Sequence, residues 1–465
     1  MKNNILKIIS FGSMGLLMLT LIAATLFEKL YGSSFALNGI YHSPWFIALW
    51  LLFVITAMIY ILHVARRGTL VLLHTSFVVI LLGAFVSFLT SQHGNILLAK
   101  DAVPASMFTT DKGTLEKLPF SLQLADIDTV YSKEDGLPID YKAHIVADNR
   151  KESCRHIASL NNPMKIDGYS FCIKGMDNGN LSLLVAHDIY GLPISYTGYM
   201  MVFVSFLMLF FDRKSNFHKT LQQLQGGRRT IEKNENPHYK DLAVRMGTIL
   251  TIPLILFVCL WYKRGIFPAT NGAESLFLFA LTTAIIAVAF KFKKRFAALR
   301  KTLIIVAGIV TVIAWFGFER DTHVQPILRT PLLGIHVTTI IIAYALLACT
   351  AINAVIALCG KENKRASKAL IGRALLYPAT MLLATGIFIG AVWANISWGR
   401  YWGWDPKEVW ALVTLLACSF AFHTRSLPFM AKPLFFHIYC IAVFIIMLFT
   451  YFGVNYLLGG IHSYA

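Results

Sequence analysis

Charged residues are scarce in this sequence of 465 residues, and acidic ones are the scarcest. Asp, Glu, Lys and Arg make up 14% of the chain, where a soluble globular protein carries about a quarter. Together with a mean hydropathy of +0.61, this scarcity excludes an ordinary soluble enzyme and a disordered chain. The 42 Lys and Arg still exceed the 24 Asp and Glu, which gives a net charge of +18. Such a surplus fits a nucleic-acid-binding protein or the cytoplasmic loops of a membrane protein, and its location decides between them.

Cysteine is also sparse, with seven residues and no Cys-x-x-Cys spacing, which argues against thiol–disulfide exchange by this chain. Cys154 and Cys172 lie in a polar stretch and could form one disulfide in an oxidising compartment. The remaining five lie in or beside apolar runs, where a thiol usually acts as a small hydrophobic group; they are Cys259, Cys349, Cys359, Cys418 and Cys440.

Long apolar runs occupy most of the chain, and a membrane-spanning helix needs about 20 mainly apolar residues. The first run follows Lys2 and Lys7 but lacks a small-residue cleavage site, so we interpret it as a retained helix and not as a signal peptide. We predict an all-α polytopic membrane protein of about eleven transmembrane helices with a small β-rich domain. The predicted spans are residues 8–27, 44–62, 69–89, 195–211, 244–261, 276–290, 303–318, 336–358, 374–393, 409–423 and 434–452.

The charge surplus lies on one side of these predicted spans. If the N-terminus is cytoplasmic, the inside segments hold 25 of the 42 basic residues and 5 of the 24 acidic ones. The inside then carries +20 and the outside −2. Because cytoplasmic loops collect Lys and Arg, we predict a cytoplasmic N-terminus and an extracytoplasmic C-terminus. The surplus is then an orientation signal, and we expect no nucleic-acid partner.

Two polar segments divide the chain. Residues 91–193 hold no spanning run and alternate apolar with polar residues between turn signals, which predicts a small β-rich extracytoplasmic domain. Residues 212–243 are polar and contain glycine, which is typical of a linker. We therefore expect a four-span half over 1–211, a cytoplasmic linker over 212–243, and a half of about seven spans over 244–465.

Tryptophan is concentrated in one stretch, since five of the nine lie between residues 393 and 410. On the predicted topology this stretch lies at the outer membrane surface, where an interfacial aromatic belt is one interpretation. A belt usually places one or two aromatic residues at a helix end, whereas this stretch combines a broad aromatic platform with two carboxylates. We therefore favour a site for a flat, mostly apolar ligand that carries charged substituents.

Four of the fourteen histidines stand out on the predicted topology, because an imidazole without a partner is costly in or beside a membrane span. His336 opens the eighth span at its outer end, and His462 lies in the outer C-terminal tail, so both share a face with the Trp-rich stretch. His74 and His423 lie in the inner half of the membrane. Two histidines at each of two depths are what bis-imidazole ligation of a metal macrocycle at two positions requires.

The motif Trp398-Gly-Arg-Tyr-Trp-Gly-Trp-Asp-Pro-Lys-Glu-Val-Trp410 closely resembles the tryptophan-rich (WWD) signature of haem-handling membrane proteins. Gly334-Ile-His336-Val and the ending Gly459-Gly-Ile-His462 resemble the ResC (CcsA) family of System II cytochrome c biogenesis. The N-terminal half, with His74 in a span that continues through Gly83, is similar to ResB (CcsB). The chain thus resembles a natural ResB–ResC fusion.

This resemblance implies a cytochrome c haem lyase (holocytochrome c synthase) in the bacterial cytoplasmic (inner) membrane. Its substrate would be haem b, bound first at His74 and His423 and then outside at His336 and His462, all four as axial ligands of the haem iron. His336 and His462 are the predicted catalytic residues. The loop over 393–410 would hold the porphyrin on the periplasmic side, through Trp398, Gly399, Arg400, Trp402, Trp404, Asp405, Glu408 and Trp410.

The resemblance also implies the partners. An apocytochrome c would present a Cys-x-x-Cys-His segment whose thiols form thioethers with the haem vinyl groups, and thiol-reducing proteins would keep those thiols reduced. Arg400, Arg329 and Lys407 are candidates for the haem propionates, and the protein itself contacts membrane lipid. The chain departs from the family in its short outer domain and in the seven spans of its ResC-like half.

Three alternatives remain open at this point. A haem exporter or chaperone would use the same sites without forming a thioether. A cytochrome b-type electron-transfer protein would use four histidines for two haems, although a buried redox haem needs no surface platform. A transporter with an aromatic belt would bind no haem.

Overall fold

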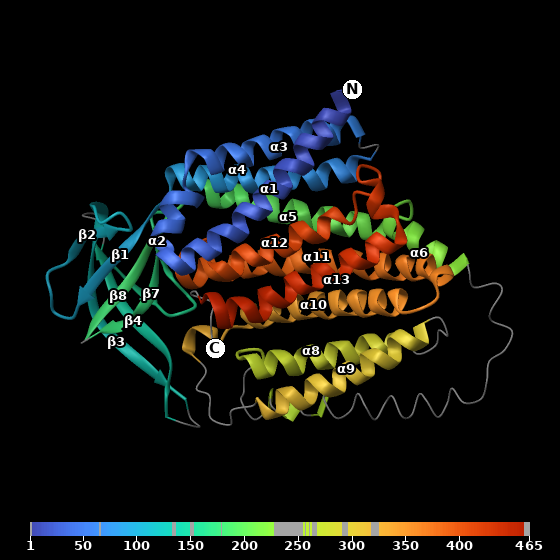
Figure 1. The fold of residues 1–465 in the computed structure, drawn as a ribbon. Coiled ribbons are helices and arrows are strands. Elements are labelled where there is room, and N and C mark those ends of the chain that lie inside the picture. The colour runs from blue at the N-terminus through green and yellow to red at the C-terminus, as the bar shows by residue number, and fades with distance from the viewer. Residues whose placement is uncertain are drawn as a thin grey trace.

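The computed structural model describes residues 2–64, 67–132, 136–148, 153–177, 179–226, 254–255, 257–259, 261–262, 267–290, 296–317 and 325–459. Figure 1 shows long helices lying side by side, with a β-sheet domain at one end of them. We call the end of the bundle that carries the sheet the sheet end, and the opposite end the distal end.

Helices make up the bundle, and capping side chains begin several of them. Thr330 accepts a hydrogen bond from Leu333 N at the start of one helix, and Asn271 accepts one from Glu274 N at another. The α-helices are α1 (Lys2–Tyr31), α2 (Ser33–Ala36), α3 (Pro44–Val64), α4 (Gly68–Thr90), α5 (Gly191–Phe211), α6 (Asn216–Gly226), α8 (Gly272–Ala289), α9 (Ala297–Phe316), α10 (Pro331–Leu358), α11 (Arg365–Trp398), α12 (Pro406–Phe420) and α13 (Pro433–Leu448). Shorter 3-10 or π segments are η1 (Leu37–Tyr41), η3 (Pro326–Leu328), η4 (Glu362–Lys364), η5 (Pro428–Ala431) and η6 (Phe449–Leu458).

The predicted polytopic membrane fold is confirmed. Within the described part of the chain, nine helices are long and apolar enough to cross a membrane. They correspond to nine of the eleven predicted spans. The tenth, predicted over 409–423, is the 15-residue helix α12, which is about 22 Å long and so shorter than a full span. The remaining one, the fifth span predicted over 244–261, lies mostly outside the described residues.

The predicted β-rich domain is an eight-stranded antiparallel sheet. Its order is β5-β4-β3-β2-β1-β8-β7-β6, so every pair joins strands that are neighbours in sequence except β1 with β8, and β5 and β6 are the two edge strands. Alternating side chains such as Phe108, Leu122 and Phe171 fill a separate apolar core. The strands are β1 (Gln92–Ala99), β2 (Ala105–Thr110), β3 (Leu115–Tyr131), β4 (Pro138–Asp148), β5 (Ser153–Ala158), β6 (Met164–Ile166), β7 (Tyr169–Asp177) and β8 (Asn180–His187).

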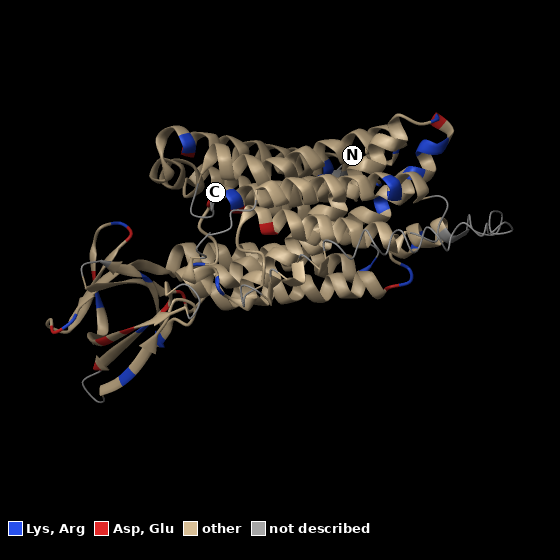
Figure 2. Ribbon diagram, turned by 90° about the horizontal axis from the view of Figure 1, so that it is seen from below, with Lys and Arg blue, Asp and Glu red and all other residues tan. Residues whose placement is uncertain are grey.

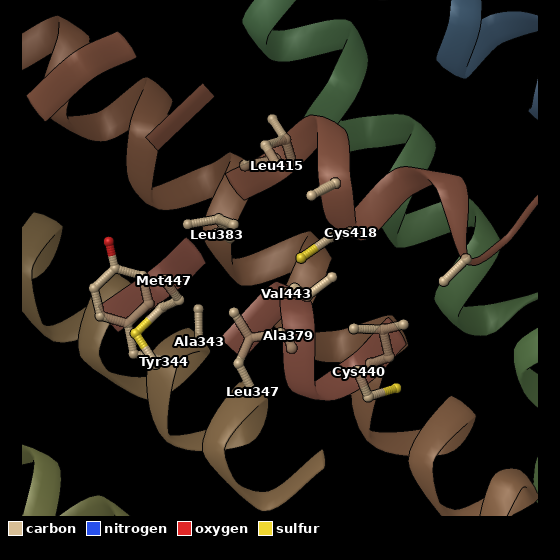
Figure 3. Close-up of a cluster of buried hydrophobic side chains, with 14 of the residues drawn as sticks. Ala343, Tyr344, Leu347, Ala379, Leu383, Leu415, Cys418, Cys440, Val443 and Met447 are labelled. Carbon is tan, nitrogen blue, oxygen red and sulfur yellow. The ribbon is translucent and has the colours of Figure 1, made fainter. Parts of the chain in front are cut away.

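The two halves of the chain pack into one bundle. Val202 and Phe206 of α5 join the buried core formed mainly by α10 to α13. The close-up in Figure 3 shows the centre of this core, where the labelled side chains of α10, α11, α12 and α13 converge. On another side, Leu17 and Leu21 of α1 pack with Val409 of α12. The helices before and after the predicted linker therefore share their hydrophobic cores.

The described part of the predicted linker 212–243 begins with helix α6, and residues 227–243 lie outside the described residues.

Basic residues gather at the distal end (Figure 2). Among the described residues of that end, the acidic side chains are Asp212 and Glu362. The basic ones are Lys7, Arg67, Arg213, Lys214, Lys219, Arg300, Lys301, Lys361, Lys364, Arg365, Lys368, Arg373, Arg425 and Lys432. The sheet end carries charges of both signs. The bundle is therefore polarised along the direction of its helices.

Candidate functional site

The Trp-rich loop, residues 399–405, joins α11 to α12 at the sheet end. Gly399 ends α11 in the left-handed conformation, with φ +74°. A Cβ atom at Gly399 would lie 2.9 Å from the Cβ of Ala186 in β8, so the loop runs directly against the sheet domain. Asp405 begins α12 as its N-cap, and Glu408 completes a capping box. Both ends of the loop are thus fixed by local backbone chemistry.

The two carboxylates of the loop are used to shape it. Glu408 accepts hydrogen bonds from Gly403 N at 2.8 Å and Asp405 N at 3.3 Å. Asp405 accepts one from Lys407 N at 3.0 Å. The Nζ of Lys407 in turn donates to Asn455 Oδ1 in η6 at 2.7 Å. These bonds tie the loop to the C-terminal helical segment, and a direct contact of Asp405 or Glu408 with a ligand remains a prediction.

The tryptophans of the motif divide into buried and accessible ones. Trp410 is 7% exposed, and its Nε1 donates to Thr25 Oγ1 of α1 at 3.1 Å. Trp393 is 3% exposed and packs edge-to-face on Trp398 at 4.8 Å between ring centres. Trp398, Trp402 and Trp404 are half-buried. The aromatic surface is therefore narrower than the sequence indicated, because two of the five indoles serve the packing of the bundle.

Trp404 holds an unusual position within this surface. Its φ of +59° lies in the left-handed region, which a bulky residue rarely adopts. Its indole stacks on Tyr41 at 4.6 Å with an interplanar angle of 12°, and Trp402 lies perpendicular to it at 5.9 Å. Aromatic contacts thus hold Trp404 in a strained backbone conformation, as is common at functional sites.

Polar side chains of the sheet domain contact the end of α11 and the loop. Arg400 forms an ion pair with Asp111 at 3.0 Å, so its predicted propionate role would compete with this carboxylate. Ser397 donates to Asn161 Oδ1 at 3.2 Å, and the thiol of Cys172 donates to Ile396 O at 3.5 Å. Cys172 is buried and Cys154 exposed, and both thiols are free in the structure.

His336, near the start of α10, lies at the same end as the loop. Its Nδ1 is 2.8 Å from Gly386 O of α11. Because a carbonyl oxygen only accepts, Nδ1 carries the hydrogen, and in the neutral ring Nε2 carries the lone pair that can bind a metal. A Cβ at Gly390 would lie 2.5 Å from the imidazole, so the ring occupies space that only glycine leaves. Gly390 precedes Trp398 by about 12 Å along α11.

The predicted partner of His336 falls outside the described residues. The structure describes the chain as far as Gly459, which follows η6, and His462 comes after it. Pairing of His336 with His462 therefore stays a prediction.

His74 of α4 and His423, just after α12, lie together at the distal end. Their ring centres are 6.2 Å apart and their planes make an angle of 83°. His74 Nδ1 is 2.7 Å from Leu70 O, and His423 Nδ1 is 2.9 Å from Ser419 O. Each ring is thus oriented by the carbonyl four residues earlier, and each neutral imidazole carries its lone pair on Nε2.

The distance between these ring centres is close to the one expected for two imidazoles that bind one iron from opposite sides. A metal–nitrogen bond of about 2.0 Å on each side, with the half-width of each imidazole, places two such ring centres about 6.4 Å apart. Within the described part of the chain, no group of three or more His, Cys, Asp or Glu side chains could hold a metal ion alone. A macrocycle that supplies its own equatorial nitrogens needs only the two imidazoles.

Some residues of this site escaped the sequence analysis. Asp111 and Asn161 lie in strands or turns of the sheet domain, and no local pattern distinguishes them. Tyr401 was part of the Trp-rich motif, but its hydrogen-bond partners lie in α4 and α5. No sequence pattern indicated Asn455, because its role depends on the hydrogen bond that it accepts from Lys407.

Comparisons with known proteins point to one family. A family model described as Cytochrome C assembly protein matches residues 269–462, and a ResB-like family model matches residues 62–188. The chain is 31% identical to the cytochrome c biogenesis protein CcsA of Chlamydomonas reinhardtii over 240 residues, which cover 48% of this chain and 67% of that protein. It is 30% identical to CcsA of Oenothera biennis over 270 residues, which cover 47% of this chain and 84% of that protein.

A third relative is longer than this chain. Protein NrfI of Wolinella succinogenes is 32% identical over 216 residues, which cover 44% of this chain but 24% of NrfI.

Proposed function

Because the chain belongs to the cytochrome c assembly protein family and carries a ResB-like segment before that domain, we propose that it is a cytochrome c haem lyase. In this proposal it moves haem b across the bacterial inner membrane and attaches it to Cys-x-x-Cys-His apocytochromes on the outer face. The single observation that carries the proposal is the His74–His423 pair, with ring centres 6.2 Å apart and both Nε2 atoms available as metal ligands.

The orientation in the membrane follows from charge. The distal end carries Lys and Arg with few acidic residues, as cytoplasmic membrane surfaces do. In this orientation the His74–His423 pair lies toward the cytoplasm. The sheet domain, His336 and the Trp-rich loop lie on the outer side, where secreted apocytochromes are found. This orientation is the one predicted from the sequence, with a cytoplasmic N-terminus and an extracytoplasmic C-terminus.

Haem is the substrate, and the chain's own groups bind and orient it. His74 and His423 hold the iron at the distal end, and His336, with His462, holds it at the sheet end. The accessible indoles of Trp398, Trp402 and Trp404 offer faces on which a porphyrin can stack.

The bond-forming chemistry needs no nucleophile from this chain. Each acceptor thiol adds across one haem vinyl group, so that sulfur bonds to one carbon and the hydrogen goes to the other, without net oxidation. The protein contributes by holding haem and acceptor in a reactive orientation. Separate thiol-reducing proteins keep the acceptor cysteines as thiols.

Co-expression with a small Cys-x-x-Cys-His acceptor tests the proposal. Wild-type protein is expected to give an acceptor that retains haem stain after denaturing electrophoresis. The matched control is an acceptor with both cysteines changed to alanine, which cannot form thioethers. Haem that is removed from the wild-type acceptor by acid–acetone extraction would contradict the lyase and favour a haem exporter.

A further inference from the structure

A chain of buried hydroxyl groups connects the Trp-rich loop to α4 and α5. Tyr401, which is 8% exposed, lies between Arg400 and Trp402 in the loop. Its hydroxyl is 3.0 Å from Ser87 Oγ of α4 and 3.1 Å from Ser195 Oγ of α5. Ser87 is 8% exposed and Ser195 fully buried, so these groups bond to one another where water has little access.

The direction of every bond in this chain can be assigned. Ser87 donates to Asp188 Oδ2, since a carboxylate only accepts. The one proton of Ser87 is therefore used, and Tyr401 donates to Ser87. Ser195 then donates to Tyr401. The bonds run in the order Ser195, Tyr401, Ser87, Asp188, in which Ser195 donates, Tyr401 and Ser87 both accept and donate, and Asp188 accepts, so each of the three hydroxyl protons has an acceptor.

The series of hydrogen-bonded hydroxyl groups ends at the Asp188 carboxylate, which the backbone at the start of α5 holds in place. Asp188 Oδ1 accepts hydrogen bonds from Gly191 N at 3.0 Å and Leu192 N at 3.2 Å, at the start of α5. The same carboxylate thus holds the helix start with one oxygen and Ser87 with the other. Burial of Tyr401 raises the pKa of its phenol, so the hydroxyl keeps the proton that it donates.

Two glycines allow α4 and α5 to approach closely enough for this arrangement. A Cβ at Gly83 of α4 would lie 2.5 Å from Ser195 N, and a Cβ at Gly191 would collide with the backbone of Ser87. Only glycine at these two positions lets Ser87 and Ser195 stand side by side and reach one hydroxyl. The serine pair is therefore built into the helix packing.

We propose that Tyr401 is a positioning residue, through which Ser87, Ser195 and Asp188 of the ResB-like half fix the Trp-rich loop for haem attachment. The inference rests on the proposed function for its link to attachment. Arg400 and Trp402 are the residues on either side of Tyr401. Loss of the hydrogen bonds of the Tyr401 hydroxyl therefore changes the positions of these two side chains. The ResB-like half is then part of the outer haem site as well as a neighbour of it.

The test compares Tyr401→Phe, which removes only the hydroxyl, with Tyr439→Phe. Tyr439 is a matched control because its hydroxyl donates to Ala417 O within the ResC-like half. Hydrogen exchange of the full-length protein is expected to be about tenfold faster over residues 399–405 in Tyr401→Phe, because the two hydrogen bonds of this hydroxyl are lost. Unchanged exchange in this loop would overturn the positioning role.

Covalent haem on the co-expressed acceptor is the second readout. Tyr401→Phe is expected to lower it about fivefold to tenfold at equal protein level, while Tyr439→Phe stays near wild type. Combining Tyr401→Phe with Ser87→Ala should cost little more than either change alone, because both break one chain. Ser87→Thr keeps a hydroxyl and should retain most of the yield.

The outcomes separate the two claims. Faster exchange with unchanged covalent haem, or losses that add in the double variant, would overturn the role in attachment. Wild-type protein that attaches no haem would contradict the proposed function, and the exchange measurement would still decide whether Tyr401 positions the loop.

Discussion

The two ends of the helix bundle hold their candidate functional side chains in different ways. At the distal end, His74 and His423 are each oriented by a carbonyl four residues earlier in their own segment. At the sheet end, the Trp-rich loop is held by partners far away in the sequence. Arg400 and Asp111 are separated by 289 positions, and Tyr401 and Ser87 by 314. One site is oriented locally, whereas the other depends on how both halves of the chain assemble.

This difference predicts different sensitivities. Haem binding at the distal end should be lost when either histidine is substituted, but it should tolerate substitutions elsewhere in the chain. The loop should respond to substitutions in α1, in the ResB-like helices and in the sheet domain, since these regions contact it or its flanking helix. α4 belongs to both ends, because it carries His74 and, about 20 Å further along, Ser87.

The largest effect is expected from His74→Ala or His423→Ala. Each change removes one of the two proposed iron ligands, and loss of even an outer-sphere partner typically costs 10-fold to 100-fold in metal affinity, so haem affinity at the distal position should fall by about tenfold or more and the haem content of the purified protein should drop. Absorbance of the purified full-length protein measures it, and added imidazole should restore part of the loss. His63→Ala is the control, because His63 Nδ1 bonds to Ile59 O in the same way but at an exposed position. The same haem content in His74→Ala, His423→Ala and His63→Ala would contradict haem binding at the distal end.

A smaller loss is expected from Gly399→Ala. The left-handed conformation costs an alanine about 1–2 kcal/mol, and its Cβ would press on Ala186 of the sheet domain. Covalent haem on the acceptor should therefore fall severalfold. Adding Ala186→Gly should recover part of this yield, since it removes the contact but leaves the backbone strain.

Gly403→Ala serves as the comparison within the same loop. The nearest side-chain atom to a Cβ there is 3.6 Å away, and Gly403 has no positive φ, so we expect near wild-type yield. Equal losses at Gly399 and Gly403 would mean that the contact with the sheet domain is irrelevant.

Thr25→Val should lower the thermal stability of the protein, with a smaller effect on the yield of covalent haem. It leaves the Trp410 indole N–H without its acceptor in the core between α1 and α12, at a cost of about 1–3 kcal/mol. Thermal unfolding of the purified protein measures this cost. Thr56→Val is the control, because the Thr56 hydroxyl donates to carbonyls of its own helix. Equal unfolding temperatures for the two variants would argue against the α1–α12 bond.

The smallest functional effect concerns the two cysteines of the sheet domain. Burial raises the pKa of Cys172 to about 11, so at pH 8 its thiol stays protonated, whereas Cys154 is exposed. Maleimide at pH 8 should label Cys154 rapidly and Cys172 only when the pH approaches 11 or denaturant is added. Mass spectrometry of the labelled peptides reads this out. Rapid labelling of Cys172 at pH 8 would show that the sheet and the end of α11 separate readily.

Much of the fold could be predicted because it follows from local signals. Apolar runs of about 20 residues predicted the spanning helices, and alternation predicted the sheet domain. Helix α12 was harder, because its 15 residues are completed by a turn in which His423 lies. Run length alone does not distinguish a short buried helix from a span.

The sites could be predicted only as sets of residues. The predicted topology placed His74 and His423 at the same end of the helices, but the distance between their rings required the coordinates. Trp410 looked like a member of the aromatic platform, yet its partner Thr25 lies 385 positions away and draws it into the core. Asp111 and Ser87 carry no motif, since their roles arise only when distant segments meet.

The most direct test of the central claim is the absorption spectrum of the purified full-length protein beside that of the His74→Ala/His423→Ala double variant. Two haem positions predict a Soret band in the wild type and a weaker band in the double variant, with imidazole restoring part of the difference. Absence of haem absorbance from every preparation, or the same band in both proteins, would contradict the account.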